Sequence, residues 1–67
     1  MDERLAIIKT VKVYAGNRHY TVDKKPGTNC QPDYYVITEH KGAKRYKVVI
    51  AGADVPKIIN ALQEASR

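Results

Sequence analysis

One stretch decides the fold, because the spacing of its apolar residues changes in the middle: Arg45-Tyr46-Lys47-Val48-Val49-Ile50-Ala51-Gly52-Ala53-Asp54-Val55-Pro56-Lys57-Ile58-Ile59. Up to Ala51 the residues alternate as in a β-strand, with Tyr46, Val48 and Ile50 on one side. Gly52-Ala53 breaks the strand, and a helical stripe follows at Val55, Ile58, Ile59, Leu62 and Ala65. Asp54 is placed to cap this helix, and Pro56 suits its first turn. The stretch predicts a strand over residues 45–51 and a C-terminal helix over residues 54–65.

Three further strands are predicted upstream. Leu5, Ile7, Val11 and Val13 share one strand side, on which Lys9 is the one polar residue, so a strand is expected over residues 5–14. Residues 18–24 and 33–40 are the next two, separated by a loop bracketed by Pro26 and Pro32. Turn residues at 15–17 and 41–44 predict hairpins. We therefore predict an α+β fold of order β-β-β-β-α, an antiparallel sheet with one C-terminal helix, in a single domain spanning residues 1–67.

The small size of the chain predicts self-association. A domain of 67 residues buries only about 60% of its unfolded surface, so its own core is marginal. Cys30 is the only cysteine, which excludes an internal disulfide, and no Cys/His group has the spacing of a structural zinc site. One helix covers only part of one face of a four-stranded sheet. A homodimer is the predicted form.

Positive charge and tyrosine rings coincide in the strand-rich part. Residues 1–53 hold ten Lys/Arg against five Asp/Glu, whereas residues 54–67 hold two of each, so the whole excess of +5 lies before the helix. All five tyrosines lie in the same part. Unpaired bases stack on aromatic rings while cations neutralise the phosphates. This pattern predicts binding of single-stranded DNA or RNA through one face of the sheet.

The face predicted to bind carries Lys12, Tyr14, Arg45 and Lys47, because the helix is expected to cover the other face. Tyr34 and Tyr35 are adjacent on a strand and must point to opposite faces. The predicted nucleic-acid-binding residues are Lys12, Tyr14, Arg18, Tyr20, Tyr34, Arg45 and Lys47, with His19, Lys24 and Tyr35 as secondary candidates.

The chain resembles a PUR repeat, the β-β-β-β-α unit of the purine-rich-element-binding (Pur-alpha-like) family, and is most similar to bacterial single-repeat members. In the second strand, Arg18, Tyr20, Asp23 and Lys25 fall on the family spacing. In the third, Asp33, Tyr34, Tyr35, Ile37, Glu39 and Lys41 follow it with one residue fewer before Ile37. The family's fourth strand is apolar and basic, as Lys47-Val48-Val49-Ile50 is, and precedes an acidic helix start that Asp54 matches.

The resemblance covers roughly residues 8–65. It implies a Whirly-like fold in which two repeats intertwine and exchange helices, and it implies binding of single-stranded DNA or RNA. With one repeat in this chain, the second repeat would come from another copy. The loop between the second and third strands is longer than usual for the family, and the absence of Trp and Phe leaves stacking to Tyr or His.

Two other functional classes stay open at this point. One is a protein-interaction adaptor that recruits its partner through an edge strand or the helix. The other is a small ribonuclease using His19 after the Gly16-Asn17 turn, although no acid/base partner is evident from spacing. Otherwise the sequence predicts no enzyme, metal, cofactor or small-molecule substrate. Without a secretory signal or a long apolar run, and with a single thiol, an intracellular, cytoplasmic protein associated with the nucleoid or with RNA is expected.

Overall fold

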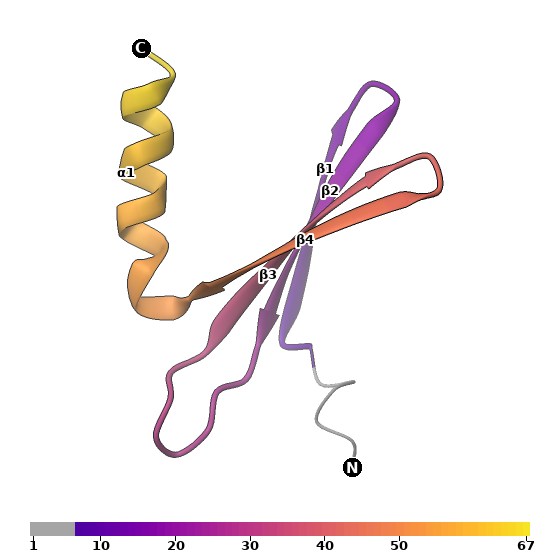
Figure 1. Ribbon diagram of the computed structural model, residues 1–67. Coiled ribbons are helices and arrows are strands. Elements are labelled where there is room, and N and C mark those ends of the chain that lie inside the picture. The colour runs from indigo at the N-terminus through magenta and orange to yellow at the C-terminus, as the bar shows by residue number, and fades with distance from the viewer. Residues whose placement is uncertain (1–6) are drawn as a thin grey trace.

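Four antiparallel strands form one sheet in the computed structural model, which describes residues 7–67. The strands β1 (Lys9–Ala15), β2 (Arg18–Lys25), β3 (Tyr34–Lys41) and β4 (Lys44–Ala51) pair in chain order. A short 3₁₀ helix, η2 (Gly52–Asp54), leads into the helix α1 (Val55–Ala65), which extends from the end of the sheet (Figure 1). The predicted α+β fold of order β-β-β-β-α is confirmed.

Both hairpins turn through two residues that begin with glycine. Ala15 pairs with Arg18 around Gly16-Asn17, and Lys41 pairs with Lys44 around Gly42-Ala43. Gly16 has φ 69° and Gly42 has φ 58°, the left-handed region that a type II′ turn needs at its first central residue. Because Arg18 also pairs with Lys41, the two turns lie at the same end of the sheet, which we name the turn end.

The residue Asp33 connects the β2–β3 loop to the start of the helical segment. Its carboxylate Oδ1 accepts a hydrogen bond of 2.9 Å from the Gly27 N–H, and its Oδ2 lies 3.9 Å from Lys24 Nζ. Its backbone carbonyl accepts a hydrogen bond of 3.0 Å from the Gly52 N–H. A Cβ atom at Gly52 would overlap the Asp33 carbonyl, so this junction requires glycine.

Most element boundaries lie within one residue of the sequence prediction, but the start of β1 and the capping role of Asp54 differ from it. β1 begins at Lys9 instead of residue 5, and Leu5 lies outside the described residues. Asp54 directly precedes α1, as predicted, but its side chain makes no capping hydrogen bond. The Asp54 carboxylate instead lies 4.0 Å from Lys57 Nζ, because η2 holds Asp54 in a helical backbone conformation.

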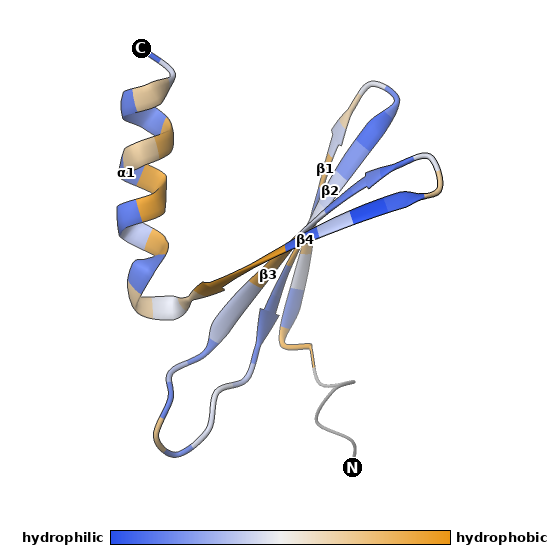
Figure 2. Cartoon of the chain, viewed as in Figure 1, coloured by the Kyte–Doolittle hydropathy of each residue, from blue (hydrophilic) through white to orange (hydrophobic). Residues whose placement is uncertain are grey.

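The strand register sorts the side chains into two faces. Val11, Val22, Ile37 and Val48 oppose one another across the four strands and share the helix-side face, with Lys9 on the same side as predicted. The apolar side of α1 turns toward this face: in Figure 2 the orange segments of the helix ribbon lie mainly on the side toward the sheet. Between them lies an apolar hollow of about 260 Å³, lined by Val22, Tyr35, Ile37, Ile50, Val55, Ile58, Ile59 and Leu62. The opposite side is named the open face.

The described residues of a single copy form no buried hydrophobic core. Among residues 7–67 no hydrophobic side chain is buried, and Thr38 is the one buried residue. Val48 on the sheet is 59% exposed and Leu62 on α1 is 65% exposed. The Cα radius of gyration is 13.4 Å, whereas a compact chain of this length has about 11 Å. The helix therefore lies beside the sheet without sealing it.

Candidate nucleic-acid interface

A row of four planar side chains crosses the open face near the turn end. Tyr14 on β1 pairs with His19 on β2, His19 with His40 on β3, and His40 with Arg45 on β4. Cross-strand partners point to the same face of a sheet. The row Tyr14–His19–His40–Arg45 spans three strand spacings, or roughly 14 Å. We name it the planar row.

The rings of this row contact one another. The His19 and His40 rings are stacked, with centroids 4.3 Å apart and planes 4° from parallel. The Tyr14 centroid lies 5.8 Å from that of His19, at a tilt of 33°. Tyr14 is 75% exposed, whereas both histidines are partly buried. Tyr14 is therefore the ring of the row whose face is open to a stacking partner.

Hydrogen bonds fix the neutral form of His40. Arg45 Nε donates to His40 Nδ1 at 3.3 Å, and a guanidinium has only donors, so Nδ1 carries no proton. In the neutral ring His40 Nε2 then carries the hydrogen and donates a hydrogen bond to Thr21 Oγ1, 3.2 Å away. Desolvation by the packed side chains, with smaller effects from His19, Arg45 and Lys12, lowers the pKa of His40, while Asp23 opposes these effects.

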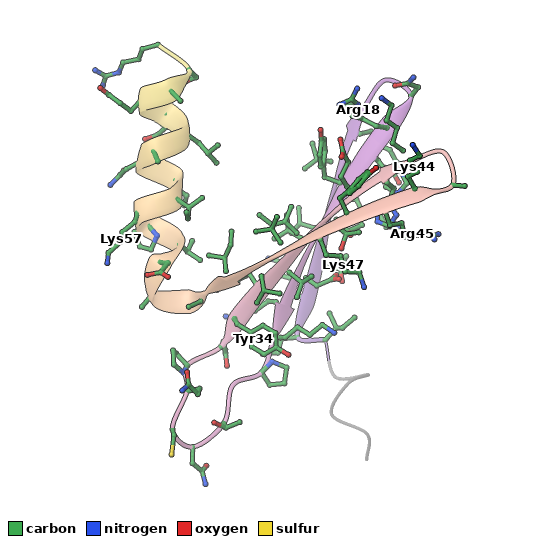
Figure 3. The ribbon with its side chains drawn as sticks, in the orientation of Figure 1. Arg18, Tyr34, Lys44, Arg45, Lys47 and Lys57 are labelled. Carbon is green, nitrogen blue, oxygen red and sulfur yellow. The ribbon has the colours of Figure 1, made fainter. Side chains whose placement is uncertain are left out.

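Cations flank the planar row on the same face. In the adjacent row Lys12 pairs with Thr21, Thr21 with Thr38, and Thr38 with Lys47. Figure 3 shows Arg45 and Lys47 along β4. Asp23 is the one acidic residue of the strands on this face, and its Oδ1 accepts a 2.7 Å hydrogen bond from Thr10 Oγ1. The open face thus presents a ring with an exposed face beside several cations, next to little negative charge.

Six of the ten predicted binding residues share the open face. Lys12, Tyr14, Arg45 and Lys47 lie there as predicted, with His19 and Tyr34 on the same face. Tyr34 pairs with Ala51 at the far end of the sheet, away from the planar row. Tyr34 and Tyr35 do point to opposite faces.

The other four predicted residues lie on the helix-side face, so the structure does not bring all ten together. Arg18 Nη1 lies 3.3 Å from Glu39 Oε2, and the Tyr20 hydroxyl lies 3.4 Å from the same oxygen. Lys24 lies near Asp33, and Tyr35 lines the apolar hollow under α1. The reason is the two-residue turn after β1, which pairs Tyr14 with His19 and leaves Arg18 and Tyr20 on the opposite side.

His40 belongs to the site but is missing from the predicted set. Most of β2, the β2–β3 loop and most of β3 separate it from His19 in the sequence, and only the β2–β3 register places the two rings in contact. The available signal was that His19 and His40 each occupy a strand position close to a glycine turn. Strands joined by hairpins at one end bring such positions together.

The described residues form neither a metal-binding group nor a membrane-spanning helix. Within residues 7–67 there is no group of three or more His, Cys, Asp and Glu side chains able to hold a metal ion. Over the same residues, no helix is long and apolar enough to cross a membrane. Cys30 lies exposed in the β2–β3 loop.

Comparisons with known proteins add no relative. No protein-family model, curated protein sequence or solved structure is similar enough to this chain to count as a match. The resemblance to PUR repeats therefore stays a hypothesis that depends on the motifs in β2, β3 and β4.

Proposed function

We propose that this chain binds single-stranded DNA or RNA through its open face, as a homodimer, and that it is not an enzyme. The observation that carries the proposal is the planar row beside Lys12 and Lys47, with Tyr14 75% exposed. A base stacks on the free face of Tyr14, and phosphates lie over the flanking cations. An intracellular location near nucleic acid, and membership of the PUR-repeat family, are part of the same proposal.

The apolar surface supports the homodimer. The accessible surface of the chain is 5657 Å², whereas a compact monomer of this mass exposes about 4,200 Å². The excess of roughly 1,400 Å² exceeds the 800 Å² or so that each partner buries in a standard interface. Most of the exposed aliphatic side chains of the strands and α1 lie on the helix-side face and on α1, with Val49 on the open face as the exception. A second copy brings an identical apolar helix to cover them.

Two other features of the same geometry, the exposed apolar face and the histidine pair, bear on the alternative functions. The exposed apolar face would also suit an adaptor that binds a different protein, and this is an outcome of the binding test below. The contact between His19 and His40 is what a histidine ribonuclease would need first. Both ring nitrogens of His40 already have partners, however, and the stacked rings leave no space between them for a scissile phosphate. The geometry favours binding.

The proposal predicts a preference for single strands. In a duplex the bases are stacked on each other and inaccessible to Tyr14, so we expect a labelled single strand to bind more tightly than a duplex of the same length. The logarithm of the affinity should fall with the logarithm of salt by about 0.7 for each phosphate contact. Titrations of both forms at two salt concentrations measure this, and gel analysis should show intact RNA.

Three other results would contradict the proposal. Equal or tighter duplex binding would indicate reading of a groove. Cleavage of the RNA would favour the ribonuclease. Failure to bind any strand, in a protein that retains its apolar surface, would favour the adaptor.

We also expect binding to strengthen as the pH falls. A phosphate near the planar row favours protonated His40, so binding raises its pKa and takes up a proton. Affinity should therefore rise as the pH falls through the raised pKa of His40 in the complex and level off below its lowered pKa in the free protein. Each unit by which binding raises the pKa corresponds to at most about a tenfold gain in affinity. Titrations between about pH 8 and 5 measure the effect.

The folding stability of the free protein should fall as the pH falls, whereas its affinity for nucleic acid should rise. The pKa of His40 is lower in the folded chain than its ordinary value of 6.5. Its contribution to folding is therefore complete above pH 6.5 and is lost as the pH falls through the folded-state pKa. His40→Gln should flatten both pH profiles, and Tyr14→Phe, which keeps both histidines, should flatten neither. A His40→Gln variant with the full pH dependence of affinity would contradict the linkage.

A further inference from the structure

Three cations gather at the turn end on the helix-side face, opposite the planar row. Arg18 pairs with Lys41, and Lys41 pairs with Lys44, so their side chains point to the same side of three adjacent strands. They line an open hollow of about 780 Å³, together with Asn17, Glu39, Gly42, Ala43 and Tyr46. None of the proposed contacts on the open face explains this hollow.

The charges of this hollow are not balanced. Like charges placed opposite each other on neighbouring strands repel, which destabilises the sheet. Glu39 offsets one charge, since its Oε2 lies 3.3 Å from Arg18 Nη1. Within residues 7–67, neither Lys41 nor Lys44 has an ion-pair partner. An anion bound between the two lysines and Arg18 would relieve the repulsion.

The chemistry of the lining fits a phosphate group. Lysine ammonium groups bind phosphate as mobile point charges, and a guanidinium adds directed donors. The Glu39 carboxylate lies 3.3 Å from Arg18 Nη1 and 3.4 Å from the Tyr20 hydroxyl, and these contacts orient the guanidinium. Tyr46, which is 57% exposed, adds a hydroxyl at the rim.

The position of β4 connects this hollow to the open face. β4 is an edge strand, and its first two residues point to opposite faces: Lys44 into the hollow and Arg45 into the planar row. Figure 3 shows Arg18, Lys44 and Arg45 together at the turn end. A single-stranded nucleic acid that leaves the planar row at Arg45 would therefore meet Lys44 directly after it passes around the β4 edge.

We propose that the hollow lined by Arg18, Lys41 and Lys44 binds a backbone phosphate of the same single strand, which bends around the β4 edge after crossing the open face. This inference rests on the proposed nucleic-acid binding and extends it from one face to both. The bound strand is then longer than the planar row alone can hold. The hollow contributes phosphate contacts without reading the bases.

The test compares strand lengths in a double variant. For Lys41→Ala/Lys44→Ala, the affinity for a strand of about 20 nucleotides should fall, and its salt slope should drop by up to about 0.7, the value for the one phosphate proposed to lie in the hollow. The affinity for a strand of about 6 nucleotides, which fits the open face only, should be unchanged. Lys57→Ala/Arg67→Ala removes the same charge from exposed positions on and after α1 and is the matched control.

The outcomes separate this inference from the proposed function. If the unmodified protein binds no strand, the proposed function fails. If it binds but the lysine variant keeps full affinity for the long strand, or loses affinity equally for both lengths, only the path around β4 is overturned. A second experiment titrates the protein with inorganic phosphate alone and follows the backbone amide resonances by NMR. Saturable shifts of the amides of residues 41–44, with no effect of strand length, would show an isolated anion site and would also overturn the path.

Discussion

Leu62→Ala should cost about 2–5 kcal/mol of folding stability, although Leu62 is 65% exposed in a single copy. In a monomer, truncating a side chain that already contacts water removes little buried surface and should cost less than about 1 kcal/mol. In the proposed homodimer the partner covers Leu62, and the variant leaves a cavity in the interface. Chemical denaturation measures the difference, and Ile58→Ala should behave in the same way.

The dimer also predicts a dependence on concentration. Folding coupled to association makes the melting temperature rise with protein concentration. Light scattering should give twice the 7.5 kDa of one chain. Gln63→Ala, one residue along but on the polar side of α1, is the control and should change stability by less than about 0.5 kcal/mol. A stably folded species of 7.5 kDa at micromolar concentration would rule out the dimer.

Tyr14→Ala should weaken binding of single strands by about 1–3 kcal/mol, or roughly 5- to 150-fold, without lowering the melting temperature. Tyr14 is 75% exposed, and its ring contact is with His19 at the end of the planar row, so we expect its removal to leave the sheet intact. Tyr14→Phe keeps the aromatic face and should keep most of the affinity. Fluorescence titration and thermal melts on the same preparations make the comparison.

Lys47→Ala complements the tyrosine variants, because it tests the phosphate contacts of the same face. It should weaken binding modestly for every sequence and reduce the salt slope by up to about one unit. If Tyr14→Ala and Lys47→Ala lose thermal stability but keep their affinity for nucleic acid, the two residues are structural and the site lies elsewhere.

Local patterns predicted the elements of this fold well. The change of period at Gly52 located the end of β4 and the start of the helical segment, and the glycine turns located both hairpins. Alternation along β1 and β4 also predicted that Lys12, Tyr14, Arg45 and Lys47 share a face. Each of these predictions depends on residues close together in the chain.

Predictions that needed the register between strands were less complete. Whether Arg18 shares a sheet face with Tyr14 depends on the length of the β1–β2 turn, since one extra residue would exchange the two faces of β2. The His19–His40 stack depends on the β2–β3 register, which is set across a loop whose shape Asp33 fixes through Gly27 and Gly52. No alternation pattern in the sequence reports such a contact.

The order of the strands leaves β1 and β4 as the two edges of the sheet, each with a row of backbone groups directed away from its neighbour. Such edges tend to add further strands and so lead to aggregation, and lysine is a common protection against this. Here β1 carries Lys9 and Lys12, and β4 carries Lys44, Arg45 and Lys47. We therefore expect the cations proposed to contact phosphate also to disfavour edge-to-edge pairing of copies of the chain, which leaves the apolar face for the proposed homodimer.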